Sequence, residues 1–382
     1  MPGSAVQVRP QLPNSAPGAP IYEWGRGLYF GVFPRHVKVM ADLHGHTHHQ
    51  TDVIIVGAGP VGLFSVFECG MVRLHCHVVD VLDDAGGQCT ALYPEKPIYD
   101  VPGFPRIEAA ELVVRLRAQA APFRPVYHLG EQVQALEHAS GGFWRLTTSK
   151  GTVLQAKAVI VAAGVGAFGP NRPPLSGIEA FEGKSVFYYV TQRENFRGKR
   201  VVIAGGGDTA VDWALSLSEI ASRVSVIHRR DKFRAAPESE AKLHALAKAG
   251  KIDMVVPYQL QGLDGADGQL KAVTVATLDG AAKKIEADVL LPFFGLSMSL
   301  GPIADWSLAL ERNQILTDPA TAATSKPGIF AVGDVVHYPG KLKLILTGFA
   351  EAAIAARSAY ALIHPETPLH FEYSTTAGIP SV

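Results

Sequence analysis

The sequence predicts an α/β protein built from two Rossmann-like units. An apolar run is followed by a glycine-rich turn and an apolar helix first at residues 51–70 and again at residues 199–220. In both copies a further short apolar run follows the helix, so each copy reads as a strand–helix–strand unit. The length of 382 residues also exceeds that of one ordinary domain.

The first unit begins at the segment TDVIIVGAGPVGLFSVFECG, which predicts a buried strand, a turn and a helix. The segment LHCHVVD predicts the next strand, which ends at Asp80. A helix is predicted over residues 108–120, and the segments FWRLTT and AVIVAAG predict further strands. The glycine- and proline-rich stretch GVGAFGPNRPPLSG then predicts a domain boundary near residues 165–177.

The second unit repeats this order in KRVVIAGGGDTAVDWALSLSEI and SRVSVIHRR, and we expect two more strands near residues 270–277 and 285–292. The segments PGIFAVGD and LTGFAEAAIAARSAYALI then predict a return to the first unit. We therefore expect a first domain made of residues 51–165 and 295–363, a second domain of residues 166–294 inserted into it, and a C-terminal extension of residues 364–382.

Residues 1–50 have a different composition from the rest of the chain. They begin with a stretch rich in Pro, Gly, Ser and Ala, which can bury little surface. The segment LHGHTHHQ offers His44, His46, His48 and His49 as possible metal ligands. We nevertheless expect a disordered N-terminal extension and no metal site, and Met40 is an alternative start of translation.

The composition is that of a soluble globular protein of the cytoplasm. The formal net charge is zero, which gives no indication of a nucleic-acid partner, and no apolar run is long enough to cross a membrane. Cys69, Cys76 and Cys89 form no CxxC pair, so neither a disulfide framework nor a zinc site is predicted.

The first glycine turn has the spacing GxGxxG at Gly57, Gly59 and Gly62. In this pattern the first glycine makes the tight turn, the second lets the backbone approach a pyrophosphate, and the third lets the helix pack on the strand. Asp80 follows 18 residues after Gly62, where a carboxylate accepts hydrogen bonds from ribose hydroxyls. Asp334 ends the strand of PGIFAVGD and is a second candidate ligand-binding carboxylate.

The second turn has the spacing GxGxxA, with Gly205 and Gly207 in the turn, Asp208 and Thr209 after them, and Ala210 in the packing position. The strand that follows ends in cations where the first unit has an acid; these are His228, Arg229 and Arg230, with Arg234 just beyond. Cations here bind a 2′-phosphate through charge-assisted hydrogen bonds, whereas a carboxylate repels it. The first site therefore suits an unphosphorylated ribose, and the second suits NADP.

The segments GAGPVG, GGGDTA, HRRDKFRA and PGIFAVGD together resemble the thioredoxin-reductase-like flavoproteins over residues 51–363. That resemblance implies FAD in the first domain and NADPH in the inserted domain. A thioredoxin reductase proper needs a CxxC pair before the second glycine turn, but residues 189–192 are Tyr, Val, Thr and Gln. With the segment GGQCTALYPEKPIYDVPGFPRI and the C-terminal extension, the chain more closely resembles the ferredoxin/flavodoxin–NADP reductases of this type.

The narrower resemblance implies that Tyr99 stacks on one face of the flavin and that an aromatic residue of the C-terminal extension covers the flavin of the partner subunit in a homodimer. Phe371 and Tyr373 are both candidates for that aromatic, and Tyr99 and Tyr373 are the residues we expect beside the reacting ring. The remaining candidate residues for the FAD site are Pro60, Val61, Gln88, Tyr93, Val133, Ala163, Gly164, Phe168 and Thr375.

The function implied by the resemblance is that of a ferredoxin–NADP⁺ reductase, which passes electrons from NADPH through FAD to ferredoxin or flavodoxin. Two alternatives remain at this stage. One is an NADPH-dependent reductase of the same fold that acts on a small disulfide or a quinone. The other is a flavin-binding redox sensor without turnover.

Overall fold

The computed structural model describes residues 40–41, 47–370 and 374–380 of the chain. Phe371 and Tyr373, two of the candidates named above, lie outside these residues, as do His44 and His46. None of the helices in the described part is both long and apolar enough to cross a membrane.

The first domain is organised around a parallel five-stranded sheet with the strand order β23-β11-β3-β4-β7. Val, Ile and Ala dominate its central strands, as expected for a sheet that is covered on both faces. The strands are β3 (Val53–Val56), β4 (Cys76–Asp80), β7 (Val126–Leu129), β11 (Ala158–Val161) and β23 (Ile329–Ala331).

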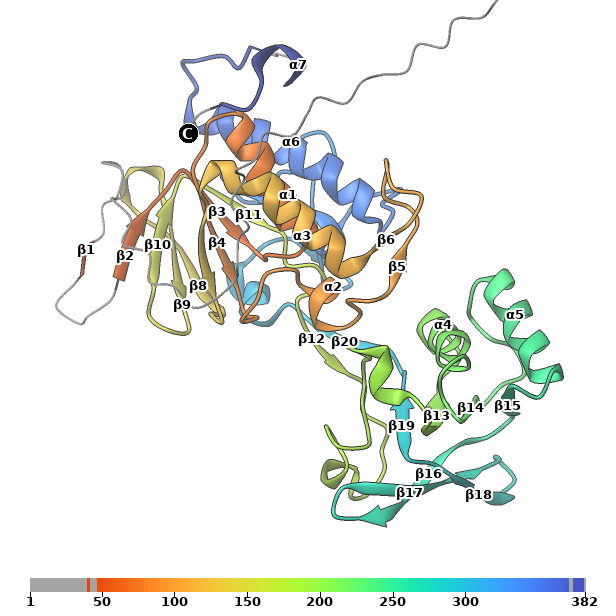
Figure 1. The fold of residues 1–382 in the computed structure, drawn as a ribbon. Coiled ribbons are helices and arrows are strands. Elements are labelled where there is room, and N and C mark those ends of the chain that lie inside the picture. Colours follow the sequence, from red (N-terminus) through yellow and green to blue (C-terminus); the bar gives the residue numbers. More distant parts are fainter. Residues whose placement is uncertain (1–39, 42–46, 371–373, 381–382) are drawn as a thin grey trace, which may run out of the picture. The chain divides into compact units, whose positions relative to one another are not determined.

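Successive residues of these strands face two different cores. Val53 and Ile55 pack with three helices, whereas Ile54 and Val56 pack with a second sheet. Figure 1 shows the helices on one face of the parallel sheet and the second sheet on the other. The helices are α1 (Pro60–Met71), α3 (Ala109–Ala120) and α6 (Ile345–Ile363). The second sheet contains β1 (Met40–Ala41), β2 (Thr47–Gln50), β8 (Val133–His138), β9 (Trp144–Thr148) and β10 (Val153–Ala156).

The inserted domain repeats the same layering. Its parallel sheet has the order β15-β14-β13-β19, with α4 and α5 on one face and an antiparallel sheet on the other. The parallel strands are β13 (Arg200–Ala204), β14 (Arg223–Ile227), β15 (Ile252–Val255) and β19 (Val289–Pro292). The helices are α4 (Asp208–Leu217) and α5 (Pro237–Lys248), and the antiparallel strands are β16 (Gln259–Ala266), β17 (Gln269–Ala276) and β18 (Ala282–Glu286).

The two crossings between the domains run as an antiparallel pair, in which β12 (Ala167–Pro170) is bonded to β20 (Leu296–Ser299). The chain then returns to the first sheet at β23, beside β11. The predicted fold class, a second Rossmann-like domain inserted into the first, is therefore confirmed. The smaller elements are α2 (Gln88–Ala91), β5 (Pro97–Ile98), β6 (Ile107–Glu108), β21 (Leu310–Glu311), β22 (Gln314–Leu316), β24 (Val336–His337) and α7 (Ser374–Ala377).

Two local expectations differ from the structure. The N-terminal extension was expected to be disordered through residue 50, but Thr47–Gln50 form strand β2, which pairs in parallel with β10. The histidine-rich sequence does not predict a strand. The strand forms because its backbone hydrogen bonds are made with β10, which is distant in the sequence. In addition, the predicted strand at residues 285–292 is two strands, β18 and β19, which belong to different sheets.

Candidate dinucleotide sites

The first glycine turn joins β3 to the N-terminus of α1. Gly57 has a φ of +109°, and a Cβ atom there would lie 2.3 Å from the carbonyl oxygen of Ala162. A Cβ atom at Gly62 would lie 1.9 Å from the carbonyl oxygen of Gly57, so the helix approaches the turn as closely as glycine permits. At Gly59 the nearest atom would be 4.0 Å away, in Gly87. The turn is therefore packed beneath and open above, as a backbone that receives a pyrophosphate needs to be.

Asp80 lies at the end of β4 and is tied to the same turn. Its Oδ2 accepts a hydrogen bond from the backbone N–H of Ala58 at 2.6 Å, and its Oδ1 accepts one from the N–H of Leu82 at 2.9 Å. Burial raises the pKa of this carboxyl group, while the two backbone donors oppose that rise. Each oxygen keeps a further lone pair, which can accept a hydrogen bond from a ribose hydroxyl.

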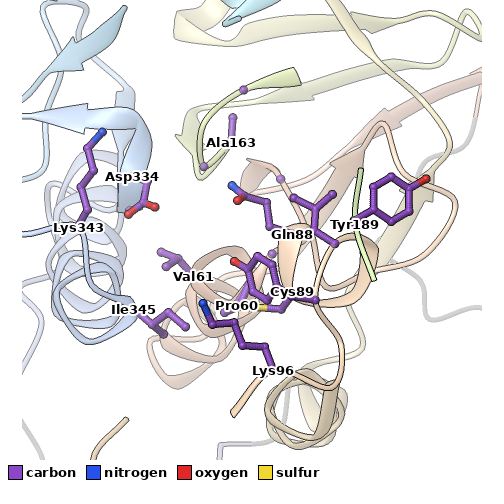
Figure 2. A pocket seen from close by; sticks show the side chains of 18 of the residues that line it. Pro60, Val61, Gln88, Cys89, Lys96, Ala163, Tyr189, Asp334, Lys343 and Ile345 are labelled. Atoms are coloured by element: carbon purple, nitrogen blue, oxygen red, sulfur yellow. The ribbon is translucent and has the colours of Figure 1, made fainter. Parts of the chain in front are cut away.

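A cavity of about 1220 Å³ opens above this turn. That volume exceeds the roughly 300–1,000 Å³ of most small-molecule sites, so it has room for a dinucleotide. Twelve of the predicted FAD-site residues line it, and Figure 2 shows Pro60, Val61, Gln88, Ala163 and Asp334 around the cavity. The twelve are Gly57, Gly59, Pro60, Val61, Asp80, Gln88, Tyr93, Tyr99, Val133, Ala163, Gly164 and Asp334.

Asp334 lies in the turn that follows β23, where Gly333 has a φ of +81°. Burial raises the pKa of the Asp334 carboxyl group, and the positive charges of Lys341 and Lys343 act in the opposite direction. Helix α6 begins shortly afterwards at Ile345, and both Lys343 and Ile345 line the cavity (Figure 2). The N-terminus of this 19-residue helix therefore adds a positive electrostatic contribution at the cavity wall.

Two tyrosines of the predicted site differ in their surroundings. Tyr93 is partly buried, and burial with the nearby groups Cys89 and Asp334 raises its pKa above the ordinary value. Tyr99 is 67% exposed although it lines the cavity, so its ring face is free to receive a flat ligand.

The second glycine turn joins β13 to α4. Gly205 has a φ of +157°, and a Cβ atom there would lie 2.6 Å from the carbonyl oxygen of Phe293. A Cβ atom at Gly206 would lie 2.3 Å from the ring of His228, whereas Gly207 has no atom within 4 Å. Ala210 is fully buried in the core beneath the turn. This turn thus has the same closed underside and open upper side as the first.

The cations beyond this turn divide into two kinds. His228 packs over Gly206, and burial together with the neighbouring arginines lowers its pKa, so the ring is neutral near pH 7. Arg229, Arg230 and Arg234 are exposed, and their guanidinium groups form no ion pair with any described residue. The backbone N–H of Arg234 donates to the carbonyl oxygen of Gly206 at 2.6 Å, which fixes residue 234 beside the turn. The three arginines, rather than the histidine, supply positive charge for a phosphate.

Asp208 and Thr209 begin α4 and also line the cavity. The Oδ1 atom of Asp208 accepts a hydrogen bond from the backbone N–H of Ala236 at 2.8 Å, so this carboxylate holds the start of α5 close to the turn. Its role in the structure is therefore to connect two segments of the inserted domain.

Some predicted residues lie away from the cavity lining. Thr375 is exposed on α7, and the side chain of Phe168 is outside the described part of the structure. Gly62 and Gly205 lie under their turns, and the arginines lie at the surface beyond the second one. The sequence did not single out several other residues that line the cavity, among them Leu82, Lys96, Glu131, Gln132, Lys343 and Ile345. The sequence could have indicated only some of these residues: Leu82 because it follows Asp80, and Lys343 and Ile345 because they lie at the start of α6.

All three cysteines are free and buried, at Cys69, Cys76 and Cys89. Burial raises the pKa of the Cys89 thiol to about 11, so it is not a thiolate at neutral pH. The residues at 189–192, where a thioredoxin reductase has its CxxC pair, contain no cysteine. The site therefore has no thiol pair positioned for disulfide exchange.

The chain matches the family model described as "Pyridine nucleotide-disulphide oxidoreductase" over residues 51–359. It is 64% identical over 332 residues to a protein of Paramagnetospirillum magneticum named "Ferredoxin--NADP reductase", which covers 87% of this chain and 98% of that protein. A protein of Rhodospirillum rubrum with the same name is 64% identical over 336 residues, with coverages of 87% and 97%.

Solved structures with a similar fold include two thioredoxin reductases. The enzyme of Lactococcus lactis has a TM-score of 0.70 and 25% identity, and the match covers 82% of this chain and 99% of that one. The enzyme of T. acidophilum has a TM-score of 0.70 and 26% identity, with coverages of 82% and 98%. The two dinucleotide turns and these similarities agree: the chain belongs to the pyridine nucleotide-disulphide oxidoreductase family and, within it, to the ferredoxin–NADP reductases.

Proposed function

We propose that this protein oxidises NADPH and passes the electrons through bound FAD to a ferredoxin. The observation that carries the proposal is the contrast between the two glycine turns. The first is followed by the carboxylate of Asp80, and the second by three exposed arginines. The relatives named ferredoxin--NADP reductase match nearly their whole length, which supports the same activity here.

The residues of the first domain fit FAD. The open backbone at Gly59 and the N-terminus of α1 suit the pyrophosphate, and Asp80 suits the ribose of the adenosine half. Asp334, Lys343 and the start of α6 form the opposite part of the cavity wall. When bound, FAD accepts a hydride from NADPH and can release electrons one at a time. The chain binds and orients FAD.

The residues of the inserted domain fit NADPH. Gly207 and the N-terminus of α4 are open to a pyrophosphate, and Arg229, Arg230 and Arg234 supply the charge for the 2′-phosphate. An acid at the end of β14 would repel that phosphate, so we expect a strong preference for NADPH over NADH.

We further propose a flavodoxin as an alternative acceptor and a homodimer in which the C-terminal extension, with Tyr373, reaches the partner's flavin. The family resemblance supports both. A cytoplasmic location is proposed because the three buried cysteines are all free, as in a reducing compartment.

Steady-state kinetics would test the proposal. Purified protein should reduce cytochrome c rapidly with NADPH when ferredoxin is added, and should lose most of that rate when NADPH is replaced by NADH. It should show no NADPH-dependent reduction of an aromatic disulfide in the presence of thioredoxin. A colourless protein, or equal rates with NADPH and NADH, would contradict the proposal; a flavoprotein whose absorbance does not bleach with NADPH would favour the redox sensor.

A further inference from the structure

Glu351 is a buried carboxylate that none of the steps above uses. It lies on α6 and is only 6% exposed. Its Oε2 accepts a hydrogen bond from the backbone N–H of Gly333 at 2.7 Å, and its Oε1 accepts one from the hydroxyl of Tyr338 at 2.6 Å. The ammonium group of Lys341 also binds Oε1. One side chain therefore satisfies three donors that would otherwise be buried without a partner.

All three donors come from one segment, residues 333–341, which links β23 to α6. Glu351 thus fixes this segment on the helix that follows it. The packing beside it is tight, because a Cβ atom at Gly348 would lie 2.4 Å from the Val61 side chain and 3.4 Å from the Cα atom of Gly333. The turn at Gly333 therefore lies close against α6, and the hydrogen bond from its N–H to Glu351 ties it to that helix.

The segment held by Glu351 carries part of the cavity wall. Asp334 follows Gly333 directly, Lys343 lies between the segment and α6, and Ile345 is the first residue of α6 (Figure 2). The position of the Asp334 carboxylate depends on the backbone of the turn. Glu351 holds that backbone at the Gly333 N–H, and Gln314 Nε2 donates to the carbonyl oxygens of Asp334 and Val336. Misplacing a binding group by a fraction of an ångström weakens binding measurably.

We propose that Glu351 is a positioning residue for FAD, which holds the Gly333–Asp334 turn in the geometry that binds the cofactor. The inference rests on the proposed function only in that FAD is the ligand of this cavity. Glu351 does not touch the cavity and acts through the backbone of the turn.

The charge of the neighbouring lysine determines which variants are informative. The side chains of Glu351 and Lys341 are 8% and 4% exposed, so removing one charge leaves the other buried without its partner. Glu351→Gln together with Lys341→Met removes both charges but keeps an oxygen that can accept the Gly333 N–H. Glu351→Leu together with Lys341→Met removes both charges and that acceptor. The comparison of the two double variants tests the uncharged hydrogen bonds of residue 351, to the Gly333 N–H and to the Tyr338 hydroxyl, apart from the ion pair.

The measurement is the dissociation constant of FAD for protein from which the cofactor has been removed, followed by the quenching of flavin fluorescence. The thermal midpoint of each cofactor-free variant is measured in parallel. We expect the Leu/Met variant to bind FAD about tenfold more weakly than the Gln/Met variant, because it lacks the acceptor for a buried backbone donor. Both variants lack the ion pair, so the difference between their cofactor-free midpoints reports the destabilisation from the lost acceptor, and the loss of FAD affinity should exceed what that difference accounts for.

Two further variants make the test complete. Glu351→Asp keeps the charge but shortens the side chain, so it should also weaken FAD binding. It replaces the Leu/Met variant in the test if that variant does not fold. Glu68→Gln removes the other ion pair of α6, between Arg357 and Glu68 at 3.1 Å, which lies between α6 and α1 away from the cavity lining. This control should leave the FAD dissociation constant unchanged.

Equal FAD affinity in the Gln/Met and Leu/Met variants, or an unchanged affinity in Glu351→Asp, would overturn the inference. So would a loss of affinity in Glu68→Gln as large as that in Glu351→Asp, because the effect would then reflect general destabilisation of α6. Failure of the unchanged protein to bind FAD would instead refute the proposed function.

Discussion

Three histidines packed together in the first domain should make the protein sensitive to mild acid. His77 on β4 and His128 on β7 share a hydrogen bond of 2.9 Å between Nδ1 and Nε2, and the ring of His49 on β2 lies 5.3 and 5.2 Å from theirs. Burial, followed by the neighbouring histidines, lowers the pKa of His77 to about 3. Burial also lowers the pKa of His49 and of His128.

When the pKa of a group is lower in the folded than in the unfolded protein, the free energy of unfolding decreases as the pH falls below the unfolded pKa. Below pH 6.5, the pKa of histidine in the unfolded chain, His77 is protonated in the unfolded protein. In the folded protein it stays neutral down to a pH of about 3. Each pH unit below 6.5 lowers the free energy of unfolding by about 1.4 kcal/mol. At pH 5, about 1.5 units below, His77 alone therefore lowers it by about 2 kcal/mol. His49 and His128 add to this loss in the same direction.

The test is His77→Asn, because an asparagine amide can occupy the place of Nδ1 and keep a hydrogen bond to His128. The free energy of unfolding of cofactor-free protein is measured in urea at pH 7, 6 and 5, by circular dichroism and by fluorescence. The variant can be less stable than the original protein at pH 7, but its loss between pH 7 and pH 5 should be smaller by about 2 kcal/mol. His370→Gln, at an exposed histidine, serves as the control. If the original protein and His77→Asn lose equal stability between pH 7 and pH 5, the reasoning is refuted.

The nucleotide sites give three further predictions. Replacing both Arg229 and Arg230 by Ala should raise the KM for NADPH about 10- to 100-fold and leave the KM for NADH nearly unchanged, since only the 2′-phosphate loses its partners. Steady-state kinetics with both nucleotides measure the two KM values, and a parallel rise in the KM for NADH would contradict the prediction. Gly62→Ala should abolish FAD retention on purification, read from the absorbance ratio at 450 and 280 nm, because its Cβ atom would lie 1.9 Å from a backbone oxygen. Asp80→Asn should weaken FAD binding and cost about 1–3 kcal/mol of stability, because an amide N–H₂ would face one of the two backbone N–H groups that Asp80 now satisfies; an unchanged FAD dissociation constant would argue against this role.

The glycine turns could be predicted because their requirements are local. A positive φ at Gly57 and contacts shorter than 3 Å at Gly57 and Gly62 follow from a strand that turns directly into a helix, and only glycine satisfies them. Asp80 could be predicted for the same reason, since its place at the strand end follows from the length of one strand–helix–strand unit. The sequence also indicated the return of the chain to the first domain, because a predicted strand that ends at Asp334 and a long predicted helix follow the last strands of the inserted domain.

Contacts between distant segments could not be predicted in this way. Thr47–Gln50 become a strand only because β10, about 100 residues later, offers a free edge. From the sequence His228 was predicted to be one of the cations that bind the phosphate. In the structure its ring packs over Gly206, and burial, followed by the surrounding arginines, lowers its pKa. Both features depend on which backbone or charge lies opposite, and a local pattern does not specify that.

The two domains show how one topology is adapted to two cofactors. Each brings a glycine turn, a helix N-terminus and the end of the next strand together, so the bare backbone of the turn does not by itself distinguish FAD from NADPH. The distinction lies in the residues after the strand. Asp80 is held by the backbone N–H groups of Ala58, in the glycine turn, and of Leu82, two residues further along the chain, and it keeps lone pairs that can accept from hydroxyl groups. The arginines beyond β14 have no ion-pair partner among the described residues, so their charge is available to a phosphate. Under the proposed function, selectivity therefore depends on whether the charge at the strand end is already satisfied by the protein or is left for the ligand.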